Sequence, residues 1–484
     1  MTTQGRVGAH ATNGSHALDQ GVEQILSLLQ SRDVSPLELV EEVLRRLDDW
    51  EPRLNAFISV DAERALTLSS QLNPRDLTGR ALWGLPVAIK DNIDVAGIKT
   101  TAGSRALHRV AATDAQCARR LADAGAVCIG KTNLPELAYG PTDTYAFGAT
   151  YNPWNCGHFP GGSSMGSGAA VAAGVVPVAL GSDTTGSVRN PASWSGVTGL
   201  KPTRGLIPTT GMLPLSPNLD HVGPIGRSAL DCAHLMEVLS TRPRLRGSRQ
   251  NPDGTDPSFV RAAKAPLEHA RIGVLRDLYT HLSPSLLGPL DDALAVLATH
   301  GVEVVDARTS GWEEAAEAAL VVLSYEAART HLSLLMSDAD VLQPQVRERL
   351  EAGLRVSTGQ YVAALRCGQR FSAELAQVFS TVEALALPSR ERTAPAISSG
   401  GHRPPGDLGF LFNAPSNLAG VPALVFPVGF DSGGLPIGLQ LVGPTGHDSA
   451  LLQLGASYQS ATTWHTQLPL LQPTGDRPPR KSSH

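Results

Sequence analysis

The chain has 484 residues, of which 42% are apolar and 18% charged, a composition that supports a large folded core and excludes intrinsic disorder. Its 40 basic and 45 acidic residues give a formal charge of -5, so the basic excess expected of a nucleic-acid-binding protein is absent. Five scattered cysteines without a C-x-x-C pair, and a start without an apolar signal segment, lead us to expect a cytoplasmic protein without disulfides or structural zinc.

The first folded elements are predicted near the N-terminus. Between residues 21 and 48 the apolar residues recur at helical spacing, and Ser35-Pro36 is placed to cap the second of two helices. Residues 1–19, which precede them, are expected to be a flexible segment.

Short apolar runs then alternate with helical patterns. Runs at 85–89, 126–130 and 176–180 are typical of buried strands, and a helical pattern occupies 114–124. The alternation continues further along the chain. Strand-like runs lie at 271–275, 302–306, 384–388 and 423–430, and helical patterns lie at 287–299 and 312–380. We therefore predict an α/β fold with a parallel or mixed sheet flanked by helices.

Two nucleotide-binding patterns are rejected. Residues 125–132 match the phosphate-loop pattern G-x-x-x-x-G-K-[ST], but residues 126–129 are an apolar strand and not a loop that exposes N–H groups. Gly166 and Gly168 lack a third glycine at the dinucleotide-binding spacing and follow a loop.

Lys90 is a candidate base because it ends an apolar strand. Burial there lowers the pKa of a lysine amine toward neutrality. An alternative is a structural lysine that pairs with Asp91. The sequence alone leaves both interpretations open.

Two Gly/Ser-rich loops, 160–164 and 181–189, flank a run of small residues and could present hydroxyl and N–H groups to one site. Ser163 and Ser187 are 24 residues apart, one in each loop. Ser164 also fits G-x-S-x-G, but a loop broken by proline precedes it where a nucleophile elbow needs a strand.

Four motifs carry a family resemblance: GLPVAIKDNIDVAG, PGGSSMGSGAAVAAG, GSDTTGSVRNPASWSGVTGLKPT and LDHVGPIGRS. Together they resemble the amidase signature family of serine amidohydrolases. The resemblance covers roughly residues 20–465 and implies one large α/β/α catalytic domain with a mixed sheet. A Pro/Arg-rich tail, 466–484, would follow it.

The resemblance implies a role for each matching position. Ser187 would be the nucleophile, Ser163, preceded by a cis peptide, the relay, and Lys90 the general base. Supporting residues would be the oxyanion-hole N–H groups of Thr184, Thr185, Gly186 and Ser187, and the bracing side chains of Ser164, Asp183 and Arg189.

Two positions depart from the family pattern. Thr185 stands where many members have glycine, which leaves the shape of the oxyanion loop open. Met165 follows the paired serines and could line a pocket or fill the core. We take Tyr139, Gly140 and Met165 as candidates for the substrate-binding wall.

These observations predict a hydrolase without cofactor or metal that cleaves a C–N bond of a small amide, anilide or carbamate through an acyl-enzyme on Ser187. Two alternatives remain: a glutaminase-type subunit of a tRNA-dependent amidotransferase, which needs partner subunits, and a catalytically silent binding protein on the same fold. We expect a small-molecule substrate and neither nucleic acid nor membrane as a partner, and a homodimer is a possible assembly.

Overall fold

The computed structural model describes residues 17–140, 145–241, 258–397 and 408–471. Most of the expected N-terminal segment 1–19 and most of the tail 466–484 lie outside the described residues.

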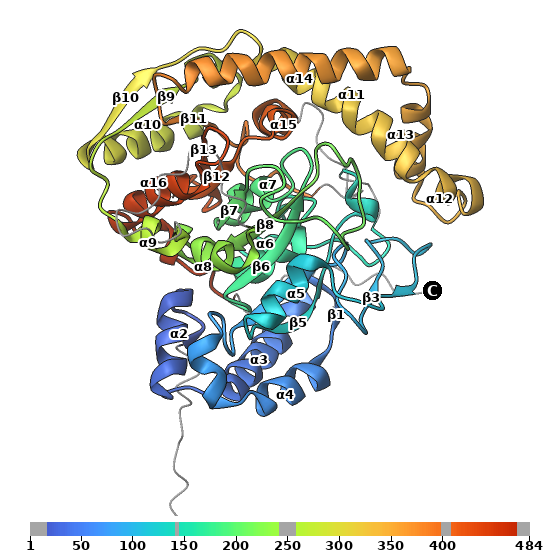
Figure 1. Ribbon diagram of the computed structural model, residues 1–484, viewed down its shortest axis with the longest axis vertical. Coiled ribbons are helices and arrows are strands. Elements are labelled where there is room, and N and C mark those ends of the chain that lie inside the picture. Colours follow the sequence, from blue (N-terminus) through green and yellow to red (C-terminus); the bar gives the residue numbers. More distant parts are fainter. Residues whose placement is uncertain (1–16, 141–144, 242–257, 398–407, 472–484) are drawn as a thin grey trace, which may run out of the picture.

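Within these residues, one sheet of eleven strands runs through the molecule (Figure 1). Its spatial order is β1 (Phe57–Val60), β5 (Val127–Thr132), β2 (Pro86–Lys90), β6 (Val178–Asp183), β8 (His221–Gly226), β7 (Thr198–Lys201), β12 (Ala423–Phe430), β13 (Pro436–Val442), β11 (Ala384–Pro388), β9 (Ala270–Val274) and β10 (Val302–Asp306). A separate ribbon pairs β3 (Lys99–Thr100) with β4 (Arg109–Val110). Every apolar run predicted to be a strand lies largely within one of these strands.

The strand directions bring two chain segments to one edge of the sheet. β2 pairs in parallel with both β5 and β6, whereas β8, β7, β12 and β13 pair antiparallel with their neighbours. The sheet is therefore mixed, as predicted. Because parallel strands end at the same edge, Lys90 at the end of β2 and Asp183 at the end of β6 lie on that edge.

Helices cover both faces of the sheet. On β7, a Cβ at Gly199 would lie 2.9 Å from the Ala192 side chain of α7, whereas on β8 a Cβ at Gly226 would lie 2.6 Å from Asp231 of α8. Gly226 is paired with Thr198, the neighbour of Gly199, so the two glycines face opposite sides. The helices in this central part are α5 (Gln116–Asp123), α6 (Met165–Ala172), α7 (Arg189–Ser195), α8 (Ala229–Leu239), α9 (Phe259–Lys264), α10 (Pro284–Thr299), α15 (Gly409–Ala419) and α16 (Asp448–Ser460).

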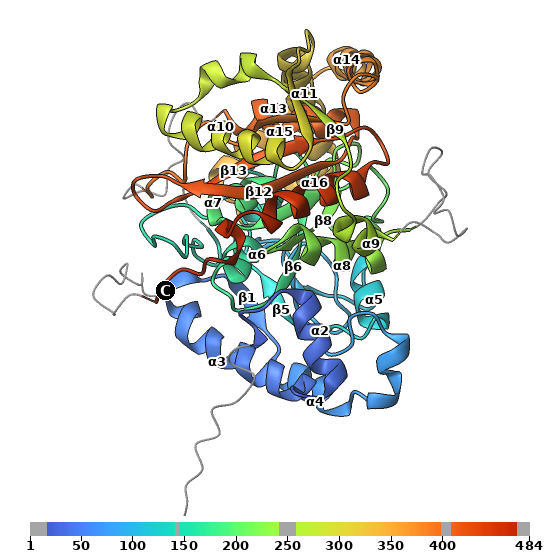
Figure 2. The same cartoon turned by 90° about the vertical axis from the view of Figure 1, so that its left-hand side faces the viewer.

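Two further helical groups lie at opposite ends of the molecule (Figures 1 and 2). At one end, the Ser35 side chain accepts the Glu38 N–H and the Glu38 carboxylate accepts the Ser35 N–H, the capping box that begins the predicted second helix. The two groups are α2 (Val22–Ser31), α3 (Pro36–Leu54) and α4 (Ala62–Gln71), and α11 (Trp312–Thr330), α12 (Leu332–Ser337), α13 (Pro344–Leu354) and α14 (Thr358–Val378). The second group has its own apolar core with α15, and this core meets the sheet at the end of the molecule that carries β11.

Candidate active site

Lys90 is buried at the end of β2 among neutral groups. Its side chain is 0% exposed, and its Nζ lies 2.7 Å from Ser163 Oγ and 2.9 Å from Ser182 Oγ. No carboxylate of the described residues forms a hydrogen bond with it. Burial therefore lowers the pKa of Lys90 to about 7, although the charges of Asp183 and Asp220 oppose this change. An amine with this pKa can accept a proton near neutral pH.

The neighbouring carboxylate has a different partner. Asp91 Oδ1 lies 2.9 Å from Lys131 Nζ, and both side chains are 0% exposed. The alternative in which Lys90 pairs with Asp91 is therefore wrong. Lys131, the lysine of the rejected phosphate-loop pattern, lies inside β5 and is held by this ion pair.

Ser182 is a neighbour of Lys90 that the sequence analysis did not single out. Its Oγ accepts from Asn92 Nδ2 at 3.0 Å and from Lys90 Nζ, and its carbonyl oxygen lies 3.4 Å from the same Nζ. Both lone pairs of the hydroxyl are thus occupied by donors. Nothing in the local pattern GSD distinguishes this serine from a structural one.

Ser163 and Ser187 line the same cavity. A cis peptide bond joins Gly162 to Ser163, as the resemblance implies, and Ser163 lies just before α6. The Ser164 N–H donates to the Ser187 carbonyl oxygen at 3.1 Å and so ties the two loops together. No hydrogen bond of the described residues joins the two hydroxyls directly, and such contacts often tighten only when substrate binds.

Ser164 has a structural position. Its side chain is 0% exposed, its Oγ donates to the Ser182 carbonyl oxygen at 3.1 Å, and the Ser182 N–H donates to it at 3.2 Å. It does not line the cavity. These contacts argue against the nucleophile-elbow interpretation and fit the supporting role expected of Ser164.

The loop that begins at Thr184 turns sharply at one glycine. Gly186 has φ +121, and a Cβ there would lie 2.8 Å from the Asn413 side chain, so glycine is required. Thr185 is not among the residues with positive φ, so its backbone conformation does not require glycine. The Gly186 N–H donates to Asp183 Oδ1 at 2.8 Å, and this contact removes Gly186 from the expected oxyanion donors in this structure. Thr184, Thr185 and Ser187 remain candidates.

Asp183 and Arg189 hold this loop in place through an ion pair and hydrogen bonds. Both are fully buried; the Arg189 Nε and Nη2 atoms each donate to the Asp183 carboxylate at 3.0 Å, and the Val188 N–H donates at 3.1 Å. Although burial acts to raise it, the charge of Arg189 holds the pKa of Asp183 well below its ordinary value. Arg189 also donates to Ser416 and Gln440, which fixes the loop to α15 and β13.

Asp220 is a second residue whose role the sequence did not indicate. One carboxylate oxygen accepts the Thr184 hydroxyl at 2.7 Å, and the other accepts the Leu215 N–H at 2.8 Å. Thr184 and Leu215 both line the cavity, so Asp220 joins two parts of its wall. Burial raises the pKa of Asp220 to about 6, despite these hydrogen bonds.

The cavity has a volume of about 420 Å³. All three residues predicted for the substrate-binding wall, Tyr139, Gly140 and Met165, line it together with Ser163 and Ser187. Further apolar wall residues are Tyr145, Phe159, Trp194, Leu215, Leu320, Leu323 and Phe410. A largely apolar chamber with a few converging polar groups is typical of a small-molecule site.

Comparison with known proteins identifies the fold and the family. The sequence matches the Amidase family over residues 38–452. The chain belongs to the amidase signature family. It is 36% identical to one of the subunits of glutamyl-tRNA(Gln) amidotransferase from Synechococcus sp. (strain CC9605), over 90% of this chain and 94% of that protein.

Solved structures agree with this membership. A crystal structure of an amidase is 32% identical, with a TM-score of 0.80 over 91% of this chain and 100% of that one. The structure of 6-aminohexanoate cyclic dimer hydrolase complexed with substrate is 29% identical, with a TM-score of 0.83 over 94% of this chain and 99% of that one. The chain therefore belongs to a family of amidohydrolases that act on C–N bonds, and it has the expected mixed sheet and flanking helices.

Two kinds of feature are absent from the described residues. They contain no group of three or more His, Cys, Asp or Glu side chains arranged to hold a metal ion. None of their helices is long and apolar enough to cross a membrane.

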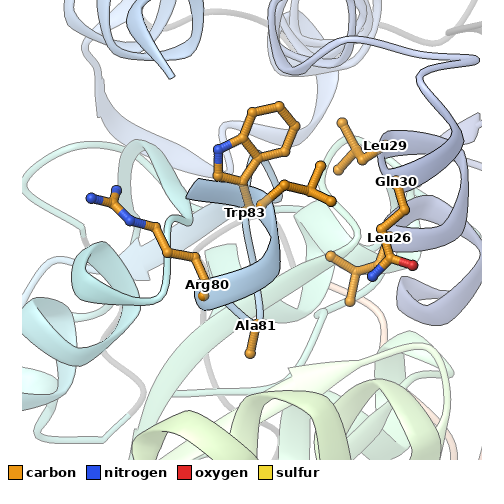
Figure 3. A pocket seen from close by; sticks show the side chains of 8 residues that line it. Leu26, Leu29, Gln30, Arg80, Ala81 and Trp83 are labelled. Atoms are coloured by element: carbon orange, nitrogen blue, oxygen red, sulfur yellow. The ribbon is translucent and has the colours of Figure 1, made fainter. Parts of the chain in front are cut away.

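A second hollow, of about 560 Å³, lies between α2 and the turn before β2 (Figure 3). Leu26 and Leu29 line one side, and Arg80 and Trp83 line the other. It contains no nucleophile or acid among its described lining residues. This amidase signature protein therefore has its candidate chemistry in the cavity at the ends of β2 and β6.

Proposed function

We propose that this protein is a cofactor-independent serine amidohydrolase that cleaves a C–N bond of a small amide, anilide or carbamate through an acyl-enzyme on Ser187. The observation that carries the proposal is the 2.7 Å separation between the buried Lys90 amine and Ser163 Oγ, in a cavity that Ser187 also lines. Cytoplasmic location is part of the proposal, and the five free cysteines support it.

In the proposed mechanism, Lys90 begins as a neutral amine. In that form its two N–H groups can donate to Ser182 Oγ and to the Ser182 carbonyl oxygen, and its lone pair can accept the proton of Ser163, whose Oγ lies 2.7 Å away. Ser163 Oγ takes the proton of Ser187 as Ser187 Oγ attacks the substrate carbonyl. The N–H groups of Thr184, Thr185 and Ser187 would then stabilise the negative charge on the carbonyl oxygen.

Proton return completes the cycle. The Lys90 ammonium gives its proton back through Ser163 to the leaving amine, and the C–N bond breaks. Water then attacks the ester on Ser187 with the same relay as base, which releases the carboxylic acid and restores the serine.

A glutaminase-type subunit is the second candidate, because the relatives include one of the subunits of glutamyl-tRNA(Gln) amidotransferase. Glutamine carries an ammonium group as well as a carboxylate. No acidic side chain among the described residues lines the cavity, whereas Arg349 and Arg390 do. This lining favours the small-molecule amidohydrolase. Copurification with partner subunits and tRNA-dependent transamidation would support the second candidate instead.

A catalytically silent binding protein on the same fold is the third possibility. The joint presence of Lys90, Ser163 and Ser187 around one cavity argues against it. Turnover of any amide, lost in the Ser187→Ala variant, would exclude it.

Covalent labelling tests the proposal most directly. A fluorophosphonate should label Ser187 of the intact protein, and mass spectrometry of the peptides locates the adduct. Ser187→Ala should lose both labelling and hydrolysis of a panel of amides, anilides and carbamates while it stays folded. Ser164→Ala is the matched control and should still be labelled, because its hydroxyl is committed to Ser182. An adduct on Ser164, or none at all, would overturn the proposal.

A further inference from the structure

The charged side chains of the cavity wall share one sign. Arg349 and Arg390 line the cavity with Ser163 and Ser187, and within the described residues no Asp or Glu does so. The rest of the wall is largely aromatic and aliphatic. In such surroundings a charge–charge attraction is stronger than in water, so an anionic group that enters is attracted and a cationic one is repelled.

Arg390 is built into the wall on an aromatic platform. It lies two residues beyond β11, is 4% exposed, and its Cζ lies 3.9 Å from the centre of the Trp194 ring. Trp194 is fixed because its indole N–H donates to the Arg392 carbonyl oxygen at 2.9 Å. The guanidinium carbon lies over the ring, and a guanidinium group carries paired N–H donors in its plane that suit a carboxylate.

The neighbouring Glu391 lies beside two arginines. Arg390 Nε lies 3.6 Å from Glu391 Oε2, which is longer than a hydrogen bond, and Glu391 Oε1 accepts from Arg392 at 3.2 Å. The Arg390 side chain is therefore not held by a direct hydrogen bond to Glu391. Glu391 does not line the cavity.

Arg349 stabilises the backbone of the cavity wall. Its Nη1 donates to the Tyr139 carbonyl oxygen at 2.7 Å, and a Cβ at Gly140 would overlap with the same nitrogen. Gly140 has φ +84, so Arg349 braces a turn that only glycine forms easily. Arg390 is therefore the better candidate for contact with a ligand.

The position of Arg390 along the wall separates it from the nucleophile. Trp194 follows Ser187 by seven residues, and α7 contains most of them. At 1.5 Å per residue, these two backbone positions lie roughly 10 Å apart along the helix. A carboxylate that Arg390 binds therefore needs a spacer before the scissile carbonyl, and three methylene groups or a phenylene ring are suitable test spacers.

We propose, resting on the amidohydrolase function above, that the substrate is an amide that also carries a carboxylate, and that Arg390 on its Trp194 platform binds this carboxylate. Arg390 then determines specificity for the part of the substrate that carries the carboxylate, which is either the acyl part or the amine part. The apolar wall binds the spacer, and the reaction at Ser187 is unchanged.

Two matched substrate pairs test the proposal. Glutaryl 4-nitroanilide is compared with pentanoyl 4-nitroanilide, which lacks only the carboxylate, and 4-acetamidobenzoate is compared with 4-methylacetanilide. In one of the pairs, we expect kcat/KM of the wild-type protein to be at least about tenfold higher for the compound with the carboxylate than for the compound without it. A charge-assisted bidentate contact contributes that much. In Arg390→Gln this ratio should fall toward one, and Arg390→Lys should restore part of it.

Arg392→Gln is the matched control. Arg392 also contacts Glu391 but does not line the cavity, so the ratio should stay at its wild-type value. A wild-type ratio near or below one in both pairs, or an equal loss for both members of a pair in folded Arg390→Gln protein, overturns the proposal.

The proposed function can fail separately. If no substrate is turned over and Ser187 is not labelled, that function fails, and Arg390 is then tested by calorimetric binding of glutaryl and pentanoyl 4-nitroanilide to Ser187→Ala. Equal binding of the two compounds there, or tighter binding of the glutaryl compound that Arg390→Gln does not reduce, overturns the assignment of Arg390.

Discussion

Lys90 and Lys131 lie on the neighbouring strands β2 and β5, and both side chains are fully buried, yet their surroundings differ. Lys131 is 2.9 Å from the Asp91 carboxylate and also donates to the Thr100 hydroxyl at 3.1 Å. Lys90 is surrounded by the hydroxyls of Ser163 and Ser182. Because both lysines are buried, they differ in the group that contacts the amine, which is a carboxylate for Lys131 and hydroxyls for Lys90.

The comparison shows how one strand pair supports both stability and chemistry. A buried ammonium and a buried carboxylate in contact compensate each other, and removal of either partner leaves the other buried alone. A buried amine beside hydroxyls loses the charge more easily, because no carboxylate in contact with it offsets the loss of hydration. Burial alone therefore does not make a lysine a base.

Replacement of Lys90 should give the largest effect on activity. Lys90→Met keeps an unbranched side chain, one atom shorter, and removes the amine, so kcat/KM should fall by about 10³-fold, the scale of a lost general base. Burial lowers the pKa of Lys90 from 10.5 to about 7, so the folded protein binds fewer protons than the unfolded chain between these values. The amine therefore costs most stability below pH 7, and the midpoint of thermal unfolding of Lys90→Met should not fall there. A folded variant with wild-type rate would contradict the mechanism.

The same substitution on the neighbouring strand should act on stability. Lys131→Met leaves the Asp91 carboxylate buried without its partner, and we expect the free energy of unfolding in urea to fall by about 3–5 kcal/mol. The double variant Asp91→Asn with Lys131→Met should recover part of this loss. If Lys131→Met were no less stable than Lys90→Met, the contrast between the two lysines would be wrong.

The pH profile sharpens the contrast further. If neutral Lys90 is the base, kcat/KM should rise about tenfold between pH 6 and 8, through an apparent pKa near 7. The rise belongs to the coupled site, and Asp220, whose pKa is about 6, contributes to its lower part. Residual activity of Lys90→Met should lack the rise, whereas folded Lys131→Met should keep it. A profile that is flat from pH 6 to 8 in the wild-type protein would count against Lys90.

The smallest effect is expected from Ser182. Its hydroxyl accepts from Lys90 and so favours the ammonium. Ser182→Ala should lower kcat/KM about fivefold, the scale of one hydrogen bond, and move the pH rise to lower values. Ser69→Ala, which also removes a buried hydroxyl, but on α4, should leave the profile in place. An unshifted profile in Ser182→Ala would show that Ser182 does not position the lysine.

Periodicity and capping chemistry predicted much of the fold. The capped helix α3 follows from Ser35 before Pro36, and seven strands follow from apolar runs, since these signals act between residues close in sequence. The seven predicted strands are β2, β5, β6, β9, β10, β11 and β12. The order of the strands in the sheet cannot be predicted from such local signals. β8 lies beside both β6 and β7, and β12 lies beside β7, because segments distant in sequence contact one another.

For the site, the sequence by itself determined the motifs and the residue types that carry chemistry: Lys90 at a strand end, Ser163 and Ser187 in glycine-rich loops, and Asp183 with Arg189. Only the tertiary structure decided how each polar group is used. It paired Asp91 with Lys131, directed the Gly186 N–H to Asp183, and brought Ser182 and Asp220 to the site. The physical reason is that a hydrogen bond or a buried charge depends on which groups share its low-dielectric surroundings, and packing, not sequence spacing, chooses them.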